Sequence, residues 1–204
     1  MDKRYAAVLF DLLTALLDSW TVWNRVAGGE APGRRWRAAY LELTYGCGAY
    51  APYESLVAEA ARRSGLPASL AASLEEQWET IAPWEDAPAL LRRLAQDHRL
   101  GVVTNCSERL GRAAARRLEV AWDVVVTSER AGFYKPHPAA YRLALAELGL
   151  PAQEVLFVAG SGFDLIGTAR VGLDTYWHNR VGLARPEAAP APLREAPTLE
   201  GLFS

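Results

Sequence analysis

Short apolar segments alternate along the chain with longer segments in which apolar residues recur every three or four positions. The short segments are typical of strands buried in a parallel sheet, and the periodic segments are typical of amphipathic helices. Strands that alternate with helices of this size indicate βαβ units and a parallel sheet. The predicted strands are 5–11, 100–104, 123–127, 154–158 and 175–177.

Only helical patterns occur between the first and second predicted strands. The glycine pairs Gly28-Gly29 and Gly46-Cys47-Gly48, and the turn Gly65-Leu66-Pro67, separate these helices. The helices predicted in this region are 21–27, 33–45, 52–64 and 67–81, and those predicted later in the chain are 88–97, 107–118, 138–148 and 163–171.

This order predicts an α/β core interrupted by a helical insertion. We expect residues 1–15 and 84–204 to form the core, and residues 16–83 to form a helical domain inserted after the first strand. The proline- and alanine-rich tail from Arg185 onward predicts only a short terminal element.

Composition narrows the class of protein. A chain of 204 residues, half of them hydrophobic, suits one core domain with a modest insertion. The formal net charge of −2 gives no electrostatic reason to expect nucleic acid or an anionic membrane as a partner. The sequence contains no apolar run of membrane-spanning length, and Cys47 and Cys106 are too few for a disulfide framework. We expect a cytoplasmic protein with reduced thiols.

Polar residues stand at the carboxyl ends of the predicted strands. In open α/β sheets, ligands bind in the crevice outside these ends. Asp11 ends the first strand, so a carboxylate is placed where a nucleophile or a metal ligand would be useful. The later strand ends contribute Thr104, Asn105, Lys135, Ser161 and Asp164.

In this order, the strand-end residues resemble the haloacid dehalogenase superfamily over essentially the whole chain. Asp11 matches the family's nucleophile, Thr104 its second-motif hydroxyl, Lys135 its lysine and Asp164 its final acidic residue. The helical insertion resembles the family's cap domain. The resemblance implies a Rossmann-like parallel sheet core with a helical cap inserted after the first strand.

Two positions argue against the phosphatases of this superfamily. These enzymes place a second aspartate, the general acid and base, two residues after the nucleophile, where this chain has Leu13. They also hold Mg²⁺ with an acidic residue of the fourth motif, where this chain has Gly160. Asp11 and Asp164 alone would make a poor magnesium site.

Three other segments resemble the hydrolytic 2-haloacid dehalogenase branch, which works without a metal. Trp36-Arg37 resembles the cap helix that carries the substrate-binding arginine of this branch. Tyr141 lies six residues after Lys135, as in the branch, and Trp177-His-Asn-Arg180-Val-Gly resembles its W-x-N-R-x-G segment. Because a halide leaves without a proton, an acid at Leu13 would not be needed.

The resemblance therefore implies hydrolysis of short 2-haloacids to 2-hydroxy acids through an ester on Asp11, with no metal or cofactor. The catalytic residues it implies are Asp11, Lys135, Thr104, Asp164 and Ser161. The substrate-binding residues it implies are Arg37, Asn105, Leu13, Thr14, Tyr141 and Phe163. The resemblance implies a small molecule as the binding partner. Members of this branch often form dimers, so the resemblance also implies a possible homodimer.

The chain departs from the family pattern around the nucleophile. The usual loop reads Asp-x-x-Gly-Thr, whereas this chain has Thr14-Ala15 in its last two places. A threonine would be strained if the turn required a positive φ at this point. In the fourth motif, Ser161 is the only hydroxyl left where the branch commonly has Ser-Ser-Asn, and Thr104 replaces a serine.

Two alternatives stay open at this point. One is another hydrolase of the same fold, including a Mg²⁺-dependent phosphatase. The other is a catalytically lapsed member that serves as a binding protein. The halogen, the chain length and the stereochemical preference do not follow from the sequence.

Overall fold

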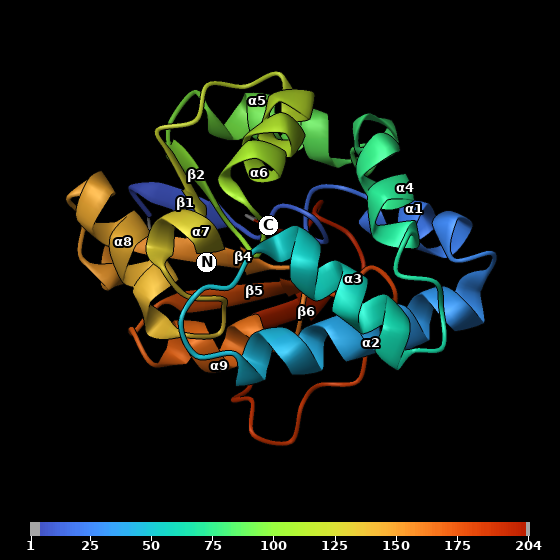
Figure 1. The fold of residues 1–204 in the computed structure, drawn as a ribbon. Helices are drawn as coiled ribbons and strands as arrows, with labels where there is room; N and C mark the ends of the chain where they lie inside the picture. Colours follow the sequence, from blue (N-terminus) through green and yellow to red (C-terminus); the bar gives the residue numbers. More distant parts are fainter. Residues whose placement is uncertain (1–4, 203–204) are drawn as a thin grey trace.

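A computed structural model describes residues 5–202 as a parallel sheet with helices on both faces (Figure 1). All neighbouring strands run parallel, in the order β3-β2-β1-β4-β5-β6. The predicted α/β class is confirmed, and β6 is the short element expected in the tail. The strands are β1 (Ala7–Phe10), β2 (Arg99–Thr104), β3 (Val124–Thr127), β4 (Val155–Ala159), β5 (Asp174–His178) and β6 (Arg194–Ala196).

The helices connect these strands and form the insertion. No helix in residues 5–202 is long and apolar enough to cross a membrane. In the insertion they are α1 (Ser19–Val26), α2 (Glu30–Gly46), α3 (Tyr53–Arg63), α4 (Leu70–Glu76) and the 3₁₀ turn Trp78–Thr80. In the rest of the chain they are α5 (Ala87–Leu94), α6 (Glu108–Ala115), α7 (Ser128–Ala131), α8 (Pro138–Leu148) and α9 (Asp164–Ala169), with 3₁₀ turns at Arg116–Leu118 and Ala152–Glu154.

The alternation of side chains along β1 divides the core between the two faces of the sheet. Val8 and Phe10 belong to the cluster that includes Leu91 of α5 and Leu110 of α6. Ala7 and Leu9 belong to the cluster on the other face, which is covered by α8 and α9. β1 lies between β2 and β4 and is buried on both faces, so its carboxyl end lies in the middle of the sheet edge.

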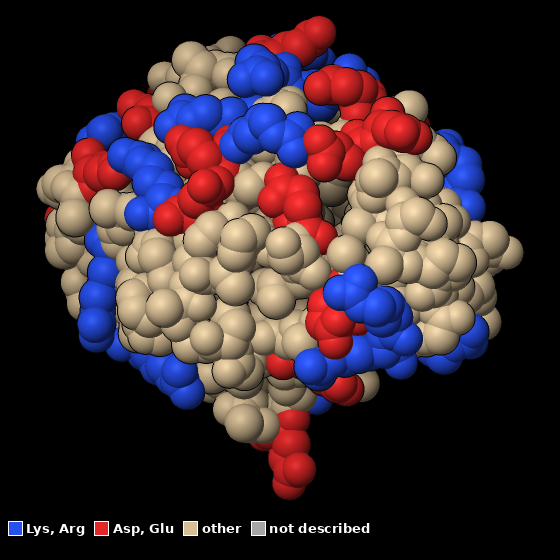
Figure 2. Space-filling model, in the orientation of Figure 1, with Lys and Arg blue, Asp and Glu red and all other residues tan. Residues whose placement is uncertain are grey.

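The insertion packs against the α5 and α6 side of the core. Its aromatic side chains, including Trp23 and Trp36, are buried in the same cluster as Phe10. On the surface, Arg109 of α6 forms ion pairs with Glu54 of α3 and Glu75 of α4. On the face drawn in Figure 2, basic and acidic side chains are interspersed.

Several details differ from the sequence prediction. The helix expected over 107–118 ends at Ala115 as α6 and continues as the 3₁₀ turn Arg116–Leu118. The helix expected over 67–81 ends at Glu76 as α4 and continues as a separate 3₁₀ turn. The buried indole of Trp78 donates to the carbonyl of Leu110 across the interface, and this contact turns the chain inward. The short helix α7 was not predicted; the Thr127 hydroxyl caps it by accepting from the Arg130 amide.

Candidate active site

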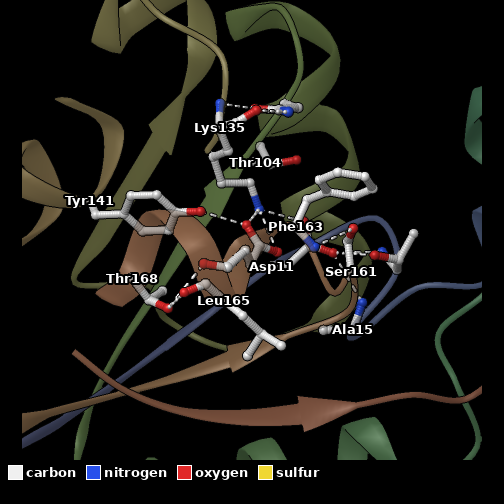
Figure 3. Close-up of polar contacts among 12 residues, drawn as sticks. Asp11, Ala15, Thr104, Lys135, Tyr141, Ser161, Phe163, Leu165 and Thr168 are labelled. Atoms are coloured by element: carbon white, nitrogen blue, oxygen red, sulfur yellow. Dashed lines mark hydrogen bonds and ion pairs between the residues drawn. The ribbon is translucent and has the colours of Figure 1, made fainter. Parts of the chain in front are cut away.

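The carboxylate of Asp11 lies at the end of the central strand and is almost fully buried. Its amide donates to the carbonyl of Val158, which extends the pairing of β1 with β4 by one residue. This register brings the ends of β1 and β4 side by side. Asp11 therefore faces the β4–α9 loop, which carries Ser161 (Figure 3). Asp164 is the first residue of α9.

Lys135 joins the two carboxylates of the site. Its Nζ lies 2.8 Å from Oδ1 of Asp11 and 3.0 Å from Oδ1 of Asp164. All three side chains are less than one-tenth exposed, so bulk water screens their interaction little. The sequence expectation that Asp11, Lys135 and Asp164 converge matches this geometry.

Asn105 holds the backbone of Lys135 in place. Its Oδ1 accepts from the Lys135 amide at 2.7 Å, and its Nδ2 donates to the Lys135 carbonyl at 3.1 Å. Ser128 donates to the same Oδ1. Asn105 also lines the cavity described below. These bonds make it a positioning residue for Lys135, while the expected contact with substrate stays a prediction.

Tyr141 approaches the site from behind Asp164. Its hydroxyl donates to Oδ1 of Asp164 at 2.6 Å, and the ring is fully buried against Phe157. Tyr141 is not among the residues that line the cavity. Its position favours a role in orienting Asp164, rather than the substrate contact expected from the sequence.

Thr14 supplies the hydroxyl that the nucleophile loop lacks at Ala15. Oδ2 of Asp11 accepts from the Thr14 amide at 3.0 Å, from the Ala15 amide at 3.2 Å and from the Thr14 hydroxyl. Glu119 is the only non-glycine residue with positive φ among residues 5–202, so Thr14 does not carry the strain considered from the sequence.

Gly160 allows β4 to approach this loop closely. A Cβ atom at position 160 would lie 2.3 Å from the Ala15 amide nitrogen and 2.3 Å from the Thr14 hydroxyl oxygen. Real Cβ atoms do not reach such distances, so no side chain fits there without moving the nucleophile loop. The absence of a side chain at position 160 therefore leaves the space in which the Thr14 hydroxyl lies.

Ser161 and Phe163 connect the core to the insertion. The Ser161 hydroxyl accepts from the Phe163 amide at 3.3 Å and hydrogen-bonds Tyr45 of α2. The rings of Tyr45 and Phe163 lie 4.5 Å apart between centroids. Tyr45, Ser161 and Phe163 all line the cavity, so α2 closes one side of the site.

The three buried charges shift one another's pKa. Burial alone would raise the pKa of Asp11, but the Lys135 charge and the bonds from Lys135 and Thr14 hold it below its ordinary value. Burial and the nearby Asp11 charge raise the pKa of Asp164, against the effect of Lys135. Burial opposes the Lys135 charge, yet the two carboxylates hold its pKa above its ordinary value. Asp11 therefore stays ionised, and Asp164 accepts a proton more readily.

Arg37 brings a buried positive charge to the same cavity. Its Nη2 donates to Ser19 at 2.6 Å, and its guanidinium lies 4.1 Å from the ring centre of Trp20. Its Nη1 is buried without a hydrogen-bond partner, and no acidic side chain in residues 5–202 forms an ion pair with it. Burial lowers the pKa of Arg37 to about 10, so the guanidinium stays charged at neutral pH.

The cavity between the sheet end and the insertion has a volume of about 300 Å³. Asp11, Thr104, Lys135 and Arg37 line it, and the Thr104 hydroxyl, like Nη1 of Arg37, is buried without a partner. Trp23 and Tyr53 also line the cavity, and the indole nitrogen of Trp23 and the hydroxyl of Tyr53 are likewise buried without a partner. Four unpaired polar groups in one cavity indicate a ligand that would pair with some of them. The expected substrate-binding residues Leu13, Thr14 and Phe163 also line the cavity.

Sequence reasoning missed one wall of the cavity. Leu183, Ala184 and Pro186 line it from the segment between β5 and β6, part of which was expected to be only a tail. The side chain of Asn179 fixes this segment, since it bonds both the amide and the carbonyl of Leu183. The segment Trp177–Gly182 was a usable signal, because it resembles a motif of the branch.

Comparison with known proteins identifies the family. Residues 7–172 match the haloacid dehalogenase-like hydrolases. The chain belongs to this family. It is 29% identical to (S)-2-haloacid dehalogenase H-109 of Pseudomonas putida over 92% of both chains, and 26% identical to haloacetate dehalogenase H-2 of a Moraxella species over 98% of this chain and 97% of that one. The structure of the L-2-haloacid dehalogenase RSc1362 superposes with a TM-score of 0.87 at 26% identity, over 98% of this chain and 97% of that chain.

Magnesium, which phosphatases of the haloacid dehalogenase superfamily require, does not fit the residues of this site. The carboxylates of Asp11 and Asp164 are both engaged by Lys135. The side chain of Leu13 offers no ligand, the Leu13 carbonyl already accepts from Ser19, and position 160 has no room for an acidic side chain. No group of three histidine, cysteine or acidic side chains able to hold a metal occurs within residues 5–202. Mg²⁺ needs near-ideal octahedral oxygen ligands, and this donor set does not supply them.

Proposed function

We propose that the protein is a hydrolase of carbon–halide bonds that converts 2-haloacids to 2-hydroxy acids through an ester on Asp11. The observation that carries this proposal is the buried guanidinium of Arg37, which has an unpaired Nη1 and faces the same cavity as the nucleophile. A buried cation without an anionic partner is costly, and an anionic substrate would supply that partner. The relatives named above, all dehalogenases of haloacids, support the same reaction.

In the first step, Oδ1 of Asp11 forms a bond to C2 of the substrate and the carbon–halogen bond breaks. Oδ1 is the better attacking atom because it accepts only from Lys135, whereas Oδ2 is held by Thr14 and Ala15. The bonding pair leaves with the halide, so no proton is needed at Leu13. Arg37 and Thr104 would hold the substrate carboxylate; in the alternative, Arg37 would receive the departing halide.

In the second step, water adds to Cγ of Asp11 and loses a proton to a base. Asp164, whose pKa is raised by burial, is the carboxylate best suited to accept this proton, and Ser161, on the loop just before α9, would orient the water. The developing negative charge on Oδ2 meets the three donors of Thr14 and Ala15. The intermediate collapses, and C2 leaves with Oδ1 as an alkoxide that takes the proton held by Asp164. The oxygen of water stays on Asp11, whose carboxyl group loses the second proton of that water to solvent.

We also propose that residues 16–83 act as a cap over this site. Arg37, Tyr45 and Trp20 all come from this region, and Leu17 pairs with Pro83 where the chain leaves and re-enters the core. The misfit of the residues for magnesium supports a reaction without metal. Two free cysteines, Cys47 and Cys106, fit a reducing cytoplasm.

The homodimer stays a prediction, which light scattering would check.

Halide release from 2-chloropropionate, measured with and without EDTA, tests the proposed function. We expect release at equal rates in both conditions, and none from Asp11→Asn. Mass spectrometry after a single turnover in oxygen-18 water should find the label in the peptide that contains Asp11. Turnover of p-nitrophenyl phosphate that requires magnesium, with no halide release, would instead establish a phosphatase. Absence of both activities would favour a binding protein.

A further inference from the structure

The cavity is larger than a short 2-haloacid requires. Pockets of roughly 300–1,000 Å³ typically hold drug-sized ligands, and this one measures about 300 Å³. The C2 carbon of 2-chloropropionate carries only a methyl group. After its carboxylate and reactive carbon occupy the polar part near Arg37 and Asp11, most of the apolar part would stay unfilled.

Much of the remaining wall is apolar and comes from three separate parts of the chain, although Arg34 of α2 also lines the cavity. Leu41 and Tyr45 extend from α2, Phe163 from the β4–α9 loop, and Leu183 and Pro186 from the segment before β6. None of these side chains carries a charge. A wall of this chemistry favours an apolar group on the substrate, because burying apolar surface is favourable in proportion to its area.

The segment that carries Leu183 and Pro186 is held in a defined position. Asn179 accepts from the Leu183 amide at 2.7 Å and donates to the Leu183 carbonyl at 2.9 Å, and it also donates to Glu195 of β6. Pro186 packs directly on Gly162, where a Cβ would lie 2.7 Å from its Cδ atom. This part of the cavity wall is therefore preorganised. It packs against the loop that carries Ser161 and Phe163.

We infer that the preferred substrate carries an aryl or longer alkyl group on C2, which lies against Phe163, Leu183 and Pro186. This inference rests on the proposed function and names its substrate class. The carboxylate is bound by Arg37 and Thr104, C2 faces Oδ1 of Asp11, and the apolar group fills the space toward the segment 183–186.

The test compares 2-bromopropionate with 2-bromo-3-phenylpropionate, which share a leaving group. A single methylene in an apolar pocket changes kcat/KM by about tenfold or more, so we expect kcat/KM for the phenyl substrate to be at least about tenfold higher. Equal values, or a preference for 2-bromopropionate, would overturn the inference and leave the proposed function intact.

A matched pair of variants locates the preference. Leu183→Asn should lower the ratio of the two kcat/KM values by about tenfold, because it replaces an apolar wall with an amide. Leu193→Asn makes the same change at an exposed leucine outside the cavity and should leave the ratio as it is. The ratio within one variant does not depend on how much of it is folded. An unchanged ratio in Leu183→Asn would exclude this wall as the cause.

If neither bromo acid reacts, the proposed function is overturned but the inference about the apolar wall is not. Measurement of ligand binding then tests that inference. In that case, calorimetry with 3-phenyllactate and lactate decides. Tighter binding of 3-phenyllactate, weakened in Leu183→Asn and not in Leu193→Asn, would support the apolar site. Equal binding of the two acids would overturn it.

Discussion

The hydroxyl of Thr14 donates to Oδ2 of Asp11, the same oxygen that accepts from the amides of Thr14 and Ala15. All of these donors come from the turn that directly follows the nucleophile. They surround the oxygen on which negative charge develops when water attacks the proposed ester. Gly160 leaves the space that the Thr14 hydroxyl occupies.

Replacement of Thr14 should therefore slow hydrolysis of the ester more than its formation. Thr14→Val keeps the shape and removes the hydroxyl, and loss of one such donor typically lowers kcat by about 10²–10³-fold. Rapid-quench mass spectrometry should show the ester on Asp11 accumulating during turnover. Thr14→Ser, which restores the hydroxyl, should abolish this accumulation. A uniform loss of both steps in Thr14→Val would contradict the assignment.

Introducing a side chain at Gly160 should destabilise the protein. Gly160→Ala places a Cβ within 2.3 Å of the Ala15 amide, and forced overpacking typically costs about 1–3 kcal/mol of unfolding free energy. Urea unfolding measures this cost. Gly46→Ala is the control, because nothing lies within 4 Å of a Cβ at that position. Equal unfolding free energies of the two variants would contradict this prediction, because they would show that the loop after Asp11 can move aside at little cost.

Removal of the Arg37 charge should separate activity from stability. Arg37→Leu loses a hydrogen-bonded charge contact to the substrate, worth about 1.5–3 kcal/mol, so kcat/KM should fall by about 10- to 150-fold. The same variant should melt at an equal or higher temperature, because a buried cation without an ionic partner is replaced by an apolar side chain. Arg35→Leu, at an exposed site on the same helix, should keep its activity. A large loss of stability in Arg37→Leu would instead assign the arginine a structural role.

The pH profile should respond to Tyr141. Burial raises the pKa of Asp164, and the hydrogen bond from Tyr141 partly opposes this rise. Tyr141→Phe removes that bond, so the pKa of Asp164 should rise further and the acid limb of kcat should move to higher pH. Asp11, whose pKa is lowered, stays ionised throughout this range. An acid limb that does not move would exclude Asp164 as the titrating base.

The same pKa directions set the acid stability of the site. Asp11 has a folded pKa below its unfolded value, so its contribution is present above the unfolded pKa and is lost as the pH falls through the folded pKa. Asp164 has the opposite shift, so its protonated form is favoured in the folded state and its contribution is lost as the pH rises through the raised pKa.

Much of the fold and the reactive centre followed from the sequence alone. Hydrophobic periodicity is a local property, so the strands and most helices could be predicted, and strand ends of a parallel sheet meet at one edge. Asp11, Lys135 and Asp164 were therefore expected together, and Leu13 and Gly160 already argued against magnesium chemistry.

The tertiary structure alone decided which side chains face one another. The direction of the Thr14 hydroxyl, the bonds from Asn105 to the Lys135 backbone and the position of Tyr141 behind Asp164 depend on how distant segments pack. The wall formed by Leu183 and Pro186 required Asn179 to hold Leu183 and to bond Glu195 of β6. The contacts of Asn105 and Tyr141 join residues far apart in the chain, and the direction of the Thr14 hydroxyl, although its bond to Asp11 is local, depends on the space left by Gly160. No local pattern of polar and apolar residues encodes this geometry.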